Sequence, residues 1–458
     1  MKPSRSEIHC KTHKVPTLQF EDHTLTSFSG LIVFQGLFVR LRLKDRLARC
    51  FSHLGGGSIF GHPVIVLSLV VHLLLGFRRL RDCESYEDDP MVKRLLGLSR
   101  LPDVATLSRT LAQADRWSVA KFRALVWELV VERLRLLQLS RVTLDFDGSV
   151  LSTTRWAEGT AVGFNKKKKG ARSYYPLFCT VAQTGQVLDL LHRPGNVHDS
   201  NGARAFVLDC ISRLRQALPG VKIEIRMDSA FFSREMADTL DAHKVEFTVS
   251  VPFERFSQLK AMIEGRLRWR GFNEQWSFFE TSWKPKSWER CYRFVFLRQK
   301  VQLQQKDPIQ LDLFVPHQWG YDFKVILTNK QTRINKVLAF HNGRGAQENL
   351  FGELKSQCQM DYIPVRTLAG NQIYLLCTLL AHNLARELQM VANPPQRQTT
   401  EKRSPLWVFQ ELNTLRRHFI QRAGRFTWPQ GRLTLTLGLN DSVKATLLHY
   451  LGALGYTA

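Results

Sequence analysis

Three short stretches of the sequence carry acidic side chains where they could bind a metal ion. Asp145 and Asp147 alternate with apolar residues in the strand-like run 141–147, so both carboxylates project from one face of that strand. Asp228 follows a second strand-like run, 222–227, at the end where the ligands of open α/β sheets collect. Each of these acids alone is also explained by a solvated strand end or a helix cap.

The third stretch is a helical segment, 344–355, whose charged residues recur at helical spacing. Arg344, Glu348 and Lys355 are separated by steps of four and seven residues, which places them on one face of a helix. From that face Glu348 can point towards the strand carboxylates, while Arg344 and Lys355 can reach towards phosphate. An ordinary amphipathic helix with charge pairs one turn apart would give the same pattern.

The elements that must position these residues follow from the apolar periodicity. Residues 1–136 are expected to form a helical N-terminal region with a DNA-binding role. Within it, 101–111 has the pattern of a short helix, a turn and a capped second helix, which suits either a DNA groove or an ordinary helix pair. Residues 137–254 contain three strands and then alternating helices and strands, which predicts an α/β domain with a mixed sheet flanked by helices.

The second half of the sequence divides into three further segments. Residues 255–340 are short strand-like runs rich in tryptophan and phenylalanine, expected to form a β-rich insertion whose tryptophans pack in a core. Residues 341–393 return to a helical pattern and would complete the α/β domain. Residues 394–458 begin with a proline-containing polar run and are expected to be a linker and a C-terminal appendix.

The net charge points to a polyanionic partner. The chain has 65 Lys and Arg against 40 Asp and Glu, a formal net charge of +25, and nucleic acid is the leading candidate. The basic run Lys166, Lys167, Lys168 and Lys169 is either a solvated loop or a contact with a phosphate backbone. A backbone contact would make binding steeply dependent on salt.

Cysteine spacing and hydropathy argue against a zinc-ribbon or redox protein and against a membrane-spanning protein. No two of the eight cysteines have the CxxC spacing of a zinc ribbon or redox pair, so they are expected to be core thiols in a reducing cytoplasm. The apolar run 63–76 is about fourteen residues long, too short to cross a bilayer. We therefore expect it to be a buried helix, with no membrane partner and a cytoplasmic location.

Taken together, the three acidic stretches resemble the DDE transposases of bacterial insertion sequences. The resemblance is to the branch with a Tyr-x2-Arg-x3-Glu-x6-Lys signature, and its four positions are filled here by His341, Arg344, Glu348 and Lys355. The spacing agrees throughout, but histidine stands in place of tyrosine, and histidine can also donate to a phosphate. The resemblance covers roughly residues 140–390.

The resemblance also selects among the aspartates. The first acid of the family usually lies in an Asp-Gly/Ser-Thr turn, which Asp147-Gly148-Ser149 matches better than Asp145 does. The second acid usually opens a turn similar to Asp228-Ser229-Ala230-Phe231. The interval from Asp228 to Glu348 is 348 − 228 = 120 residues, which an insertion like that of some family members would explain.

The family implies a fold, a chemistry and partners for this chain. It implies an RNase H-like sheet in which Asp147, Asp228 and Glu348 hold two Mg²⁺ ions, with Mn²⁺ as a substitute and Asp145 as second choice for Asp147. It implies cleavage of double-stranded DNA at terminal inverted repeats and transfer into target DNA, by a homodimer assembled on the DNA. The side chains expected to contact DNA are those of Arg344, Lys355, His341 and Lys166–Lys169.

Two other functions use the same residues. A decayed or repurposed transposase would bind DNA without cutting it, and metal-dependent nicking of a terminal repeat would separate the two cases. A different two-metal nuclease on the same fold would cleave DNA without strand transfer.

Overall fold

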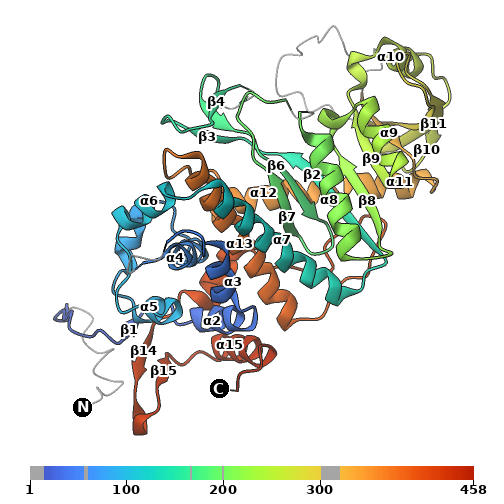
Figure 1. Cartoon of the computed structure of the whole chain (residues 1–458). Helices are drawn as coiled ribbons and strands as arrows, with labels where there is room; N and C mark the ends of the chain where they lie inside the picture. The colour runs from blue at the N-terminus through green and yellow to red at the C-terminus, as the bar shows by residue number, and fades with distance from the viewer. Residues whose placement is uncertain are drawn as a thin grey trace.

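The computed structural model describes residues 15–55, 60–163, 165, 168–198, 201–300 and 320–457. Its N-terminal part is helical, as the periodicity predicts (Figure 1). The helices of this part are α2 (Leu31–Arg40), α3 (Leu43–Cys50), α4 (His62–Leu75), η1 (Leu80–Tyr86), α5 (Pro90–Leu96), α6 (Val104–Ala112) and α7 (Arg116–Leu137).

Local signals in the sequence set the ends of these helices. The side chains of Asp89, Asp103 and Asp115 accept hydrogen bonds from backbone N–H groups in the first turns of α5, α6 and α7. Gly76 and Gly97 end α4 and α5 with positive φ angles of 96° and 74°, a conformation that glycine adopts without strain. The helical pair expected in 101–111 is instead the single helix α6, because Asp103 caps it directly after an extended segment.

The apolar run 63–76 forms the buried helix α4. Eleven of its residues, Ile65 to Leu75, are buried among the surrounding helices, which explains why every side of the helix is apolar. In the described part of the chain no single helix is long and apolar enough to cross a membrane. One pair, α4 with η1, reaches that length and composition only with a bend of 78°.

The second part of the fold is a mixed sheet flanked by helices, which confirms the predicted α/β class. In the described residues its strand order is β10-β11-β12-β13-β9-β8-β2-β6-β7. β2 is parallel to β8, β8 is parallel to β9, and the other neighbours are antiparallel. The strands are β2 (Arg141–Gly148), β6 (Leu177–Val181), β7 (Gln186–Leu191), β8 (Lys222–Met227), β9 (Glu246–Val251), β10 (Arg270–Gly271), β11 (Trp276–Trp283), β12 (Tyr292–Lys300) and β13 (Tyr321–Thr328).

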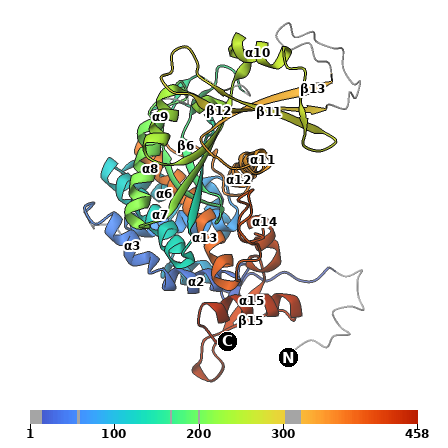
Figure 2. The same cartoon turned by 90° about the vertical axis from the view of Figure 1, so that its right-hand side faces the viewer.

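The predicted insertion is rich in strands, and these strands extend the central sheet. β13 pairs with β9 from Val325↔Val251 to Thr328↔Thr248, so the segment continues the sheet beyond β9 (Figure 2). Trp288 is buried, and the rings of Trp269, Trp276 and Trp283 are partly buried against hydrophobic cores, as expected, while Trp319 lies outside the described residues. The boundary predicted at 340 falls inside a helix, α11 (Ile334–Asn342).

The two faces of the sheet differ in chemistry. Val142, Leu144 and Phe146 of β2 join a hydrophobic core with α7, α8 (Ala203–Ala217) and α9 (Arg234–Ala242). Residues that alternate with them on β2, β8 and β9 are polar and face α11 and α12 (Gly345–Gln357), which lie together on that side of the sheet (Figure 2). The alternation of a strand therefore separates a structural face from a polar one.

The N-terminal helices share a core with later segments of the chain. One cluster of buried residues runs from Phe28 to Leu129 and includes α12, α13 (Leu368–Ala392) and the C-terminal elements. The C-terminal elements are α14 (Leu412–Leu415), β14 (Gly424–Thr427), β15 (Thr434–Leu437) and α15 (Asp441–Ala453). β14 pairs with β1 (Leu25–Thr26), so the first and last parts of the described chain lie side by side (Figure 1).

The segment predicted to be a linker is held in place by the sheet. Arg403 forms an ion pair with the buried Glu224 of β8, at 2.9 Å, and the carbonyl oxygen of Lys402 accepts a hydrogen bond from Arg226. Gly343 allows this close approach, because an added Cβ would stand 2.0 Å from the Lys402 carbonyl oxygen. We call residues 394–411 the C-terminal strap.

Candidate active site

The two predicted aspartates lie on neighbouring parallel strands at the same edge of the sheet. β2 and β8 pair in register, with Asp145 opposite Arg226 and Phe146 opposite Met227. Asp147 is the next residue of β2, Asp228 follows the last residue of β8, and both side chains are partly exposed. The structure therefore brings these two carboxylates together where the parallel strands end.

Asp145 has a structural role. Its two oxygens accept hydrogen bonds from Nε and Nη2 of Arg226, at 2.5 and 2.7 Å. Both side chains are buried, and Nη1 of Arg226 also donates to the Phe340 carbonyl oxygen at 3.0 Å. Both oxygens of the Asp145 carboxylate are therefore occupied by a buried cationic partner.

Gly148, the last residue of β2, follows Asp147 where the Tyr175 side chain packs closely. The backbone N–H of Gly148 donates to the Asp147 carboxylate at 2.8 Å. A Cβ at position 148 would stand 2.7 to 2.8 Å from the end of the Tyr175 side chain, which would have to shift. On β8, the Asp228 carboxylate accepts from the backbone N–H of Ala230 at 3.0 Å and so opens the turn into η2 (Ser229–Phe231).

Helix α12 sits over this edge and carries Glu348 and Lys355 of the predicted signature, with Arg344 at its N-cap. Nη1 of Arg344 lies 3.3 Å from the Asp147 carboxylate, and Nε2 of Gln347 donates to the Asp145 carbonyl oxygen at 3.0 Å. These contacts anchor the start of α12 on the end of β2. Glu348 is in the first turn of α12, one turn beyond Arg344, with an exposed side chain.

In this structure the Glu348 carboxylate does not form a metal-binding cluster with Asp147 and Asp228. Within the described residues, no three side chains of His, Cys, Asp or Glu converge closely enough to hold a metal ion. Glu353, the nearby acid on the same helix, is buried and paired with Arg386 and His382. The exposed Glu348 is therefore the acid of α12 that solvent or a ligand can reach.

His341 has a position that disagrees with a DNA contact. It is 1% exposed, and its two ring nitrogens lie 3.0 Å from the Thr248 hydroxyl and 2.9 Å from the Ser250 hydroxyl. Burial lowers the pKa of His341, and the nearby cations Lys324 and Arg344 lower it further. A buried imidazole of α11 that hydrogen-bonds to β9 cannot reach a phosphate here, so this expectation is corrected.

Residues 9–455 match the family described as transposase DDE domain group 1. The chain belongs to this family. No curated protein sequence is similar enough to the chain to count as a match.

Solved structures of other transposases resemble parts of the chain at low identity. A piggyBac transposase synaptic complex with hairpin DNA is 12% identical over 85% of this chain and 79% of that chain, with a TM-score of 0.44. A Mos1 paired-end complex with the left transposon end is 12% identical over 37% of this chain and 56% of that chain, with a TM-score of 0.19. A Mos1 paired-end complex with Mn is 13% identical over the same shares, with a TM-score of 0.18.

A lysine that sequence reasoning missed lies near Glu348 of this transposase. Lys324 of β13 donates to the side-chain oxygen of Asn342 at 3.2 Å and lines a cavity of about 340 Å³ next to Ser229. Burial lowers the pKa of Lys324 to about 8, with repulsion from Arg344 acting in the same direction and attraction to Glu348 opposing it. Only the pairing of β13 with β9 places this residue, and no sequence motif indicates it.

A groove of about 1840 Å³ is lined by Gly148, the residue after Asp147. Its lining also includes Lys355 from α12 and Lys168 from the predicted basic run. Lys169 is exposed, while Lys166 and Lys167 lie outside the described residues. Two of the expected DNA-contacting residues, Lys355 and Lys168, therefore share one groove beside the candidate site.

Proposed function

We propose that this protein is an active transposase that cleaves DNA at the ends of an insertion sequence and joins them to target DNA. The observation that carries the proposal is the placement of Asp147 and Asp228 at the ends of adjacent parallel strands, beneath the helix that bears Arg344 and Glu348. The strand order β7-β6-β2-β8-β9, with β6 antiparallel to its neighbours, supports an RNase H-like assignment.

The donor chemistry of these side chains fits the metal that the family implies. Carboxylate oxygens are the ligands that Mg²⁺ and Mn²⁺ prefer, and no thiol or free imidazole belongs to the set. Asp147, Asp228 and Glu348 would hold two ions, with Glu348 as the member that must still approach. When bound, the ions would activate water and stabilise the leaving oxygen of a phosphodiester.

The other residues of the site would bind and orient the DNA. We propose that Arg344, which reaches the Asp147 carboxylate, contacts the phosphate that is cut, and that Lys355 and Lys168 hold the backbone in the adjoining groove. The N-terminal helices would contribute to binding of double-stranded DNA. A homodimer acting on chromosomal DNA in a bacterial cytoplasm is part of the same proposal, because two ends must be joined.

The test uses a DNA fragment that carries both flanks of the coding sequence. With the purified protein we expect nicking at the two element ends in Mg²⁺ or Mn²⁺, no nicking in EDTA, and later products joined to a target plasmid. Asp228→Asn should remove cleavage, while Asp209→Asn, a change at an exposed acid on α8, should leave it unchanged. Cleavage by Asp228→Asn at the wild-type rate, or cleavage in EDTA, would contradict the proposal.

A non-catalytic DNA-binding protein is the second candidate. It is favoured by one observation, that the three acids do not converge in the described residues. This candidate predicts binding of the element ends without nicking in any divalent ion. A two-metal nuclease would instead stop after cleavage and give no joined products.

A further inference from the structure

The C-terminal elements contain a basic segment that the candidate active site does not use. Residues 412–440 include five arginines and one histidine but no acidic residue. Arg416 is buried and donates to carbonyl oxygens at the end of α4, whereas Arg417, Arg425 and Arg432 are exposed. The exposed part of this segment therefore offers a surface to a negatively charged ligand.

The outer part of the segment is a β-hairpin that extends from the body of the protein. β14 and β15 pair from Gly424↔Leu437 to Thr427↔Thr434, and within the described residues β1 pairs with Gly424 and Arg425 alone. Beyond this base the hairpin is a two-stranded ribbon, on the side of the N-terminal helices that faces away from the mixed sheet (Figure 1). We call residues 424–437 the C-terminal hairpin.

The base of the C-terminal hairpin is fixed to the helical part of the protein. The Ser29 N–H donates to the Arg422 carbonyl oxygen at 3.0 Å, and the Phe426 N–H donates to the Thr24 carbonyl oxygen at 2.9 Å. An added Cβ on Gly424 would stand 2.1 Å from the Ser29 hydroxyl oxygen, so the two segments pack closely. Phe426 joins the core of the N-terminal helices. A hairpin held in this way loses little entropy when its tip binds a ligand.

The tip of the C-terminal hairpin presents a tryptophan and an arginine from a tight turn. The Gly431 N–H donates to the Trp428 carbonyl oxygen at 3.3 Å, and the Arg432 N–H donates to the Pro429 carbonyl oxygen at 3.1 Å. Gln430 and Gly431 complete the turn with positive φ angles of 54° and 76°. Trp428 is 60% exposed and Arg432 is also exposed. Tryptophan and arginine are residue types that concentrate at binding surfaces.

Charge and packing select the kind of partner. A second copy that used the same surface would bring arginine against arginine, which is repulsive. A lipid surface would need a broad apolar face, but Leu433, Leu435 and Leu437 pack against the protein core. Duplex DNA supplies rows of phosphates, and its major groove, about 12 Å wide, admits a two-stranded β-ribbon.

We propose that the C-terminal hairpin enters a groove of duplex DNA at a distance from the cleavage site. Arg432 would bind a backbone phosphate and the Trp428 ring would lie against the sugars of the groove wall, while the bases stay paired. The choice of DNA as partner rests on the proposed function. Because the N-terminal helices lie between the hairpin and the mixed sheet, this contact needs DNA that continues well beyond the cleaved end (Figure 1).

The test measures binding in EDTA, so that no cleavage can occur. The probes are element-end duplexes, taken from the flanks of the coding sequence and shortened stepwise from the side away from the cleavage position. The double variant Trp428→Ala/Arg432→Ala should bind the short duplexes as wild type does and lose at least about fivefold in affinity for the long ones. For long duplexes, the slope of log affinity against log salt should fall by about one.

Two further variants control for charge and place. Arg432→Lys keeps the charge at the tip and should retain most of the affinity. Arg290→Ala removes an equally charged side chain, 60% exposed and paired with Asp241 of α9, and should bind every duplex as wild type does.

The proposal is overturned if the double variant binds long duplexes as wild type does, or loses the same factor on short and long ones. It is also overturned if the double variant loses only binding to vesicles of anionic phospholipid, because the partner would then be a lipid surface. Since no cleavage is measured, a protein that never cuts DNA can still pass this test, and an active transposase can fail it.

Discussion

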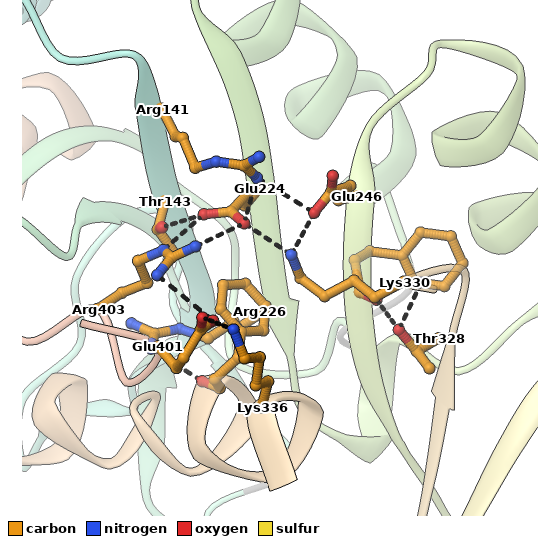
Figure 3. Close-up of polar contacts among 12 residues, drawn as sticks. Arg141, Thr143, Glu224, Arg226, Glu246, Thr328, Lys330, Lys336, Glu401 and Arg403 are labelled. Atoms are coloured by element: carbon orange, nitrogen blue, oxygen red, sulfur yellow. Dashed lines mark hydrogen bonds and ion pairs between the residues drawn. The ribbon is translucent and has the colours of Figure 1, made fainter. Parts of the chain in front are cut away.

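The two ends of the polar face of the sheet differ in how far their acidic side chains are buried. Where β2, β8 and β9 begin, Glu224 is fully buried and is surrounded by Arg141, Lys330 and Arg403 (Figure 3). Where the same strands end, Asp147 and Asp228 are partly exposed. One end of the face is closed by ion pairs, and the other remains accessible to solvent and ligands.

The difference follows from burial. Burial alone would raise the pKa of Glu224, but the hydrogen bond from Arg403 and the charge of Lys330 outweigh it and lower the pKa to about 2. One step further along the strands, Asp145 and Arg226 form a second buried ion pair. A buried carboxylate in this sheet is always matched by a cation, so the acids left accessible at the strand ends are the ones available for chemistry.

Activity should separate two acids that lie five residues apart on α12. Glu348→Gln changes an exposed proposed metal ligand, so cleavage of element ends should fall by about a thousandfold or more, as expected when a group that stabilises transition-state charge is lost. The free energy of unfolding of Glu348→Gln should differ from that of the wild type by less than about 0.5 kcal/mol. Glu353→Gln changes a buried ion pair and should instead lower stability. Equal activity of Glu348→Gln and wild type would remove Glu348 from the site.

Stability should separate the two acids of β2. Asp145→Ala leaves the buried Arg226 without its carboxylate and should lower the free energy of unfolding by about 3–5 kcal/mol. Asp147→Ala removes a partly exposed acid and should cost less than about 1 kcal/mol. Urea denaturation of both variants measures the difference. A larger loss for Asp147→Ala would contradict the assignment of Asp145 as the structural member.

Lowering the pH should lower the free energy of unfolding through protonation of Glu224. Because its folded pKa lies below the ordinary value of 4.5, its stabilising contribution is present above pH 4.5 and is lost as pH falls towards about 2. The wild type should lose about 3 kcal/mol more than Glu224→Gln across this window. Denaturation curves for both proteins, measured between pH 5 and about pH 2.5, test this. Parallel curves would show that Glu224 keeps an ordinary pKa.

The smallest effect is expected at the rim of the same network. Lys336 pairs with Glu401 of the C-terminal strap at 2.9 Å, but both side chains are more than a third exposed (Figure 3). Lys336→Ala should therefore lower the free energy of unfolding by less than about 1 kcal/mol, and less still in high salt. A loss as large as that of Asp145→Ala would mean that the strap depends on its rim as much as on Arg403.

Much of the architecture was predictable because it depends on local pattern. Periodicity predicted the N-terminal helices, the buried helix α4, and the two strands whose ends carry Asp147 and Asp228. The insertion was predicted as strand-rich, but its attachment to β9 was not, because strand pairing over such distances is set by the sheet edge that is left open. The strap was predicted as a linker, since its polar composition does not reveal that Arg403 meets a buried acid.

The sequence by itself determined which residue types could bind metal and phosphate, and at what spacing along each strand and helix. Tertiary structure decided which of them are accessible. Asp145 and Asp147 are two residues apart on one strand face, yet Arg226 from the neighbouring strand buries one and leaves the other at the edge. His341 fits the spacing of the signature, but it is buried in α11 and hydrogen-bonds to two residues of β9. Spacing fixes the direction of a side chain, whereas its exposure depends on what the rest of the chain packs against it.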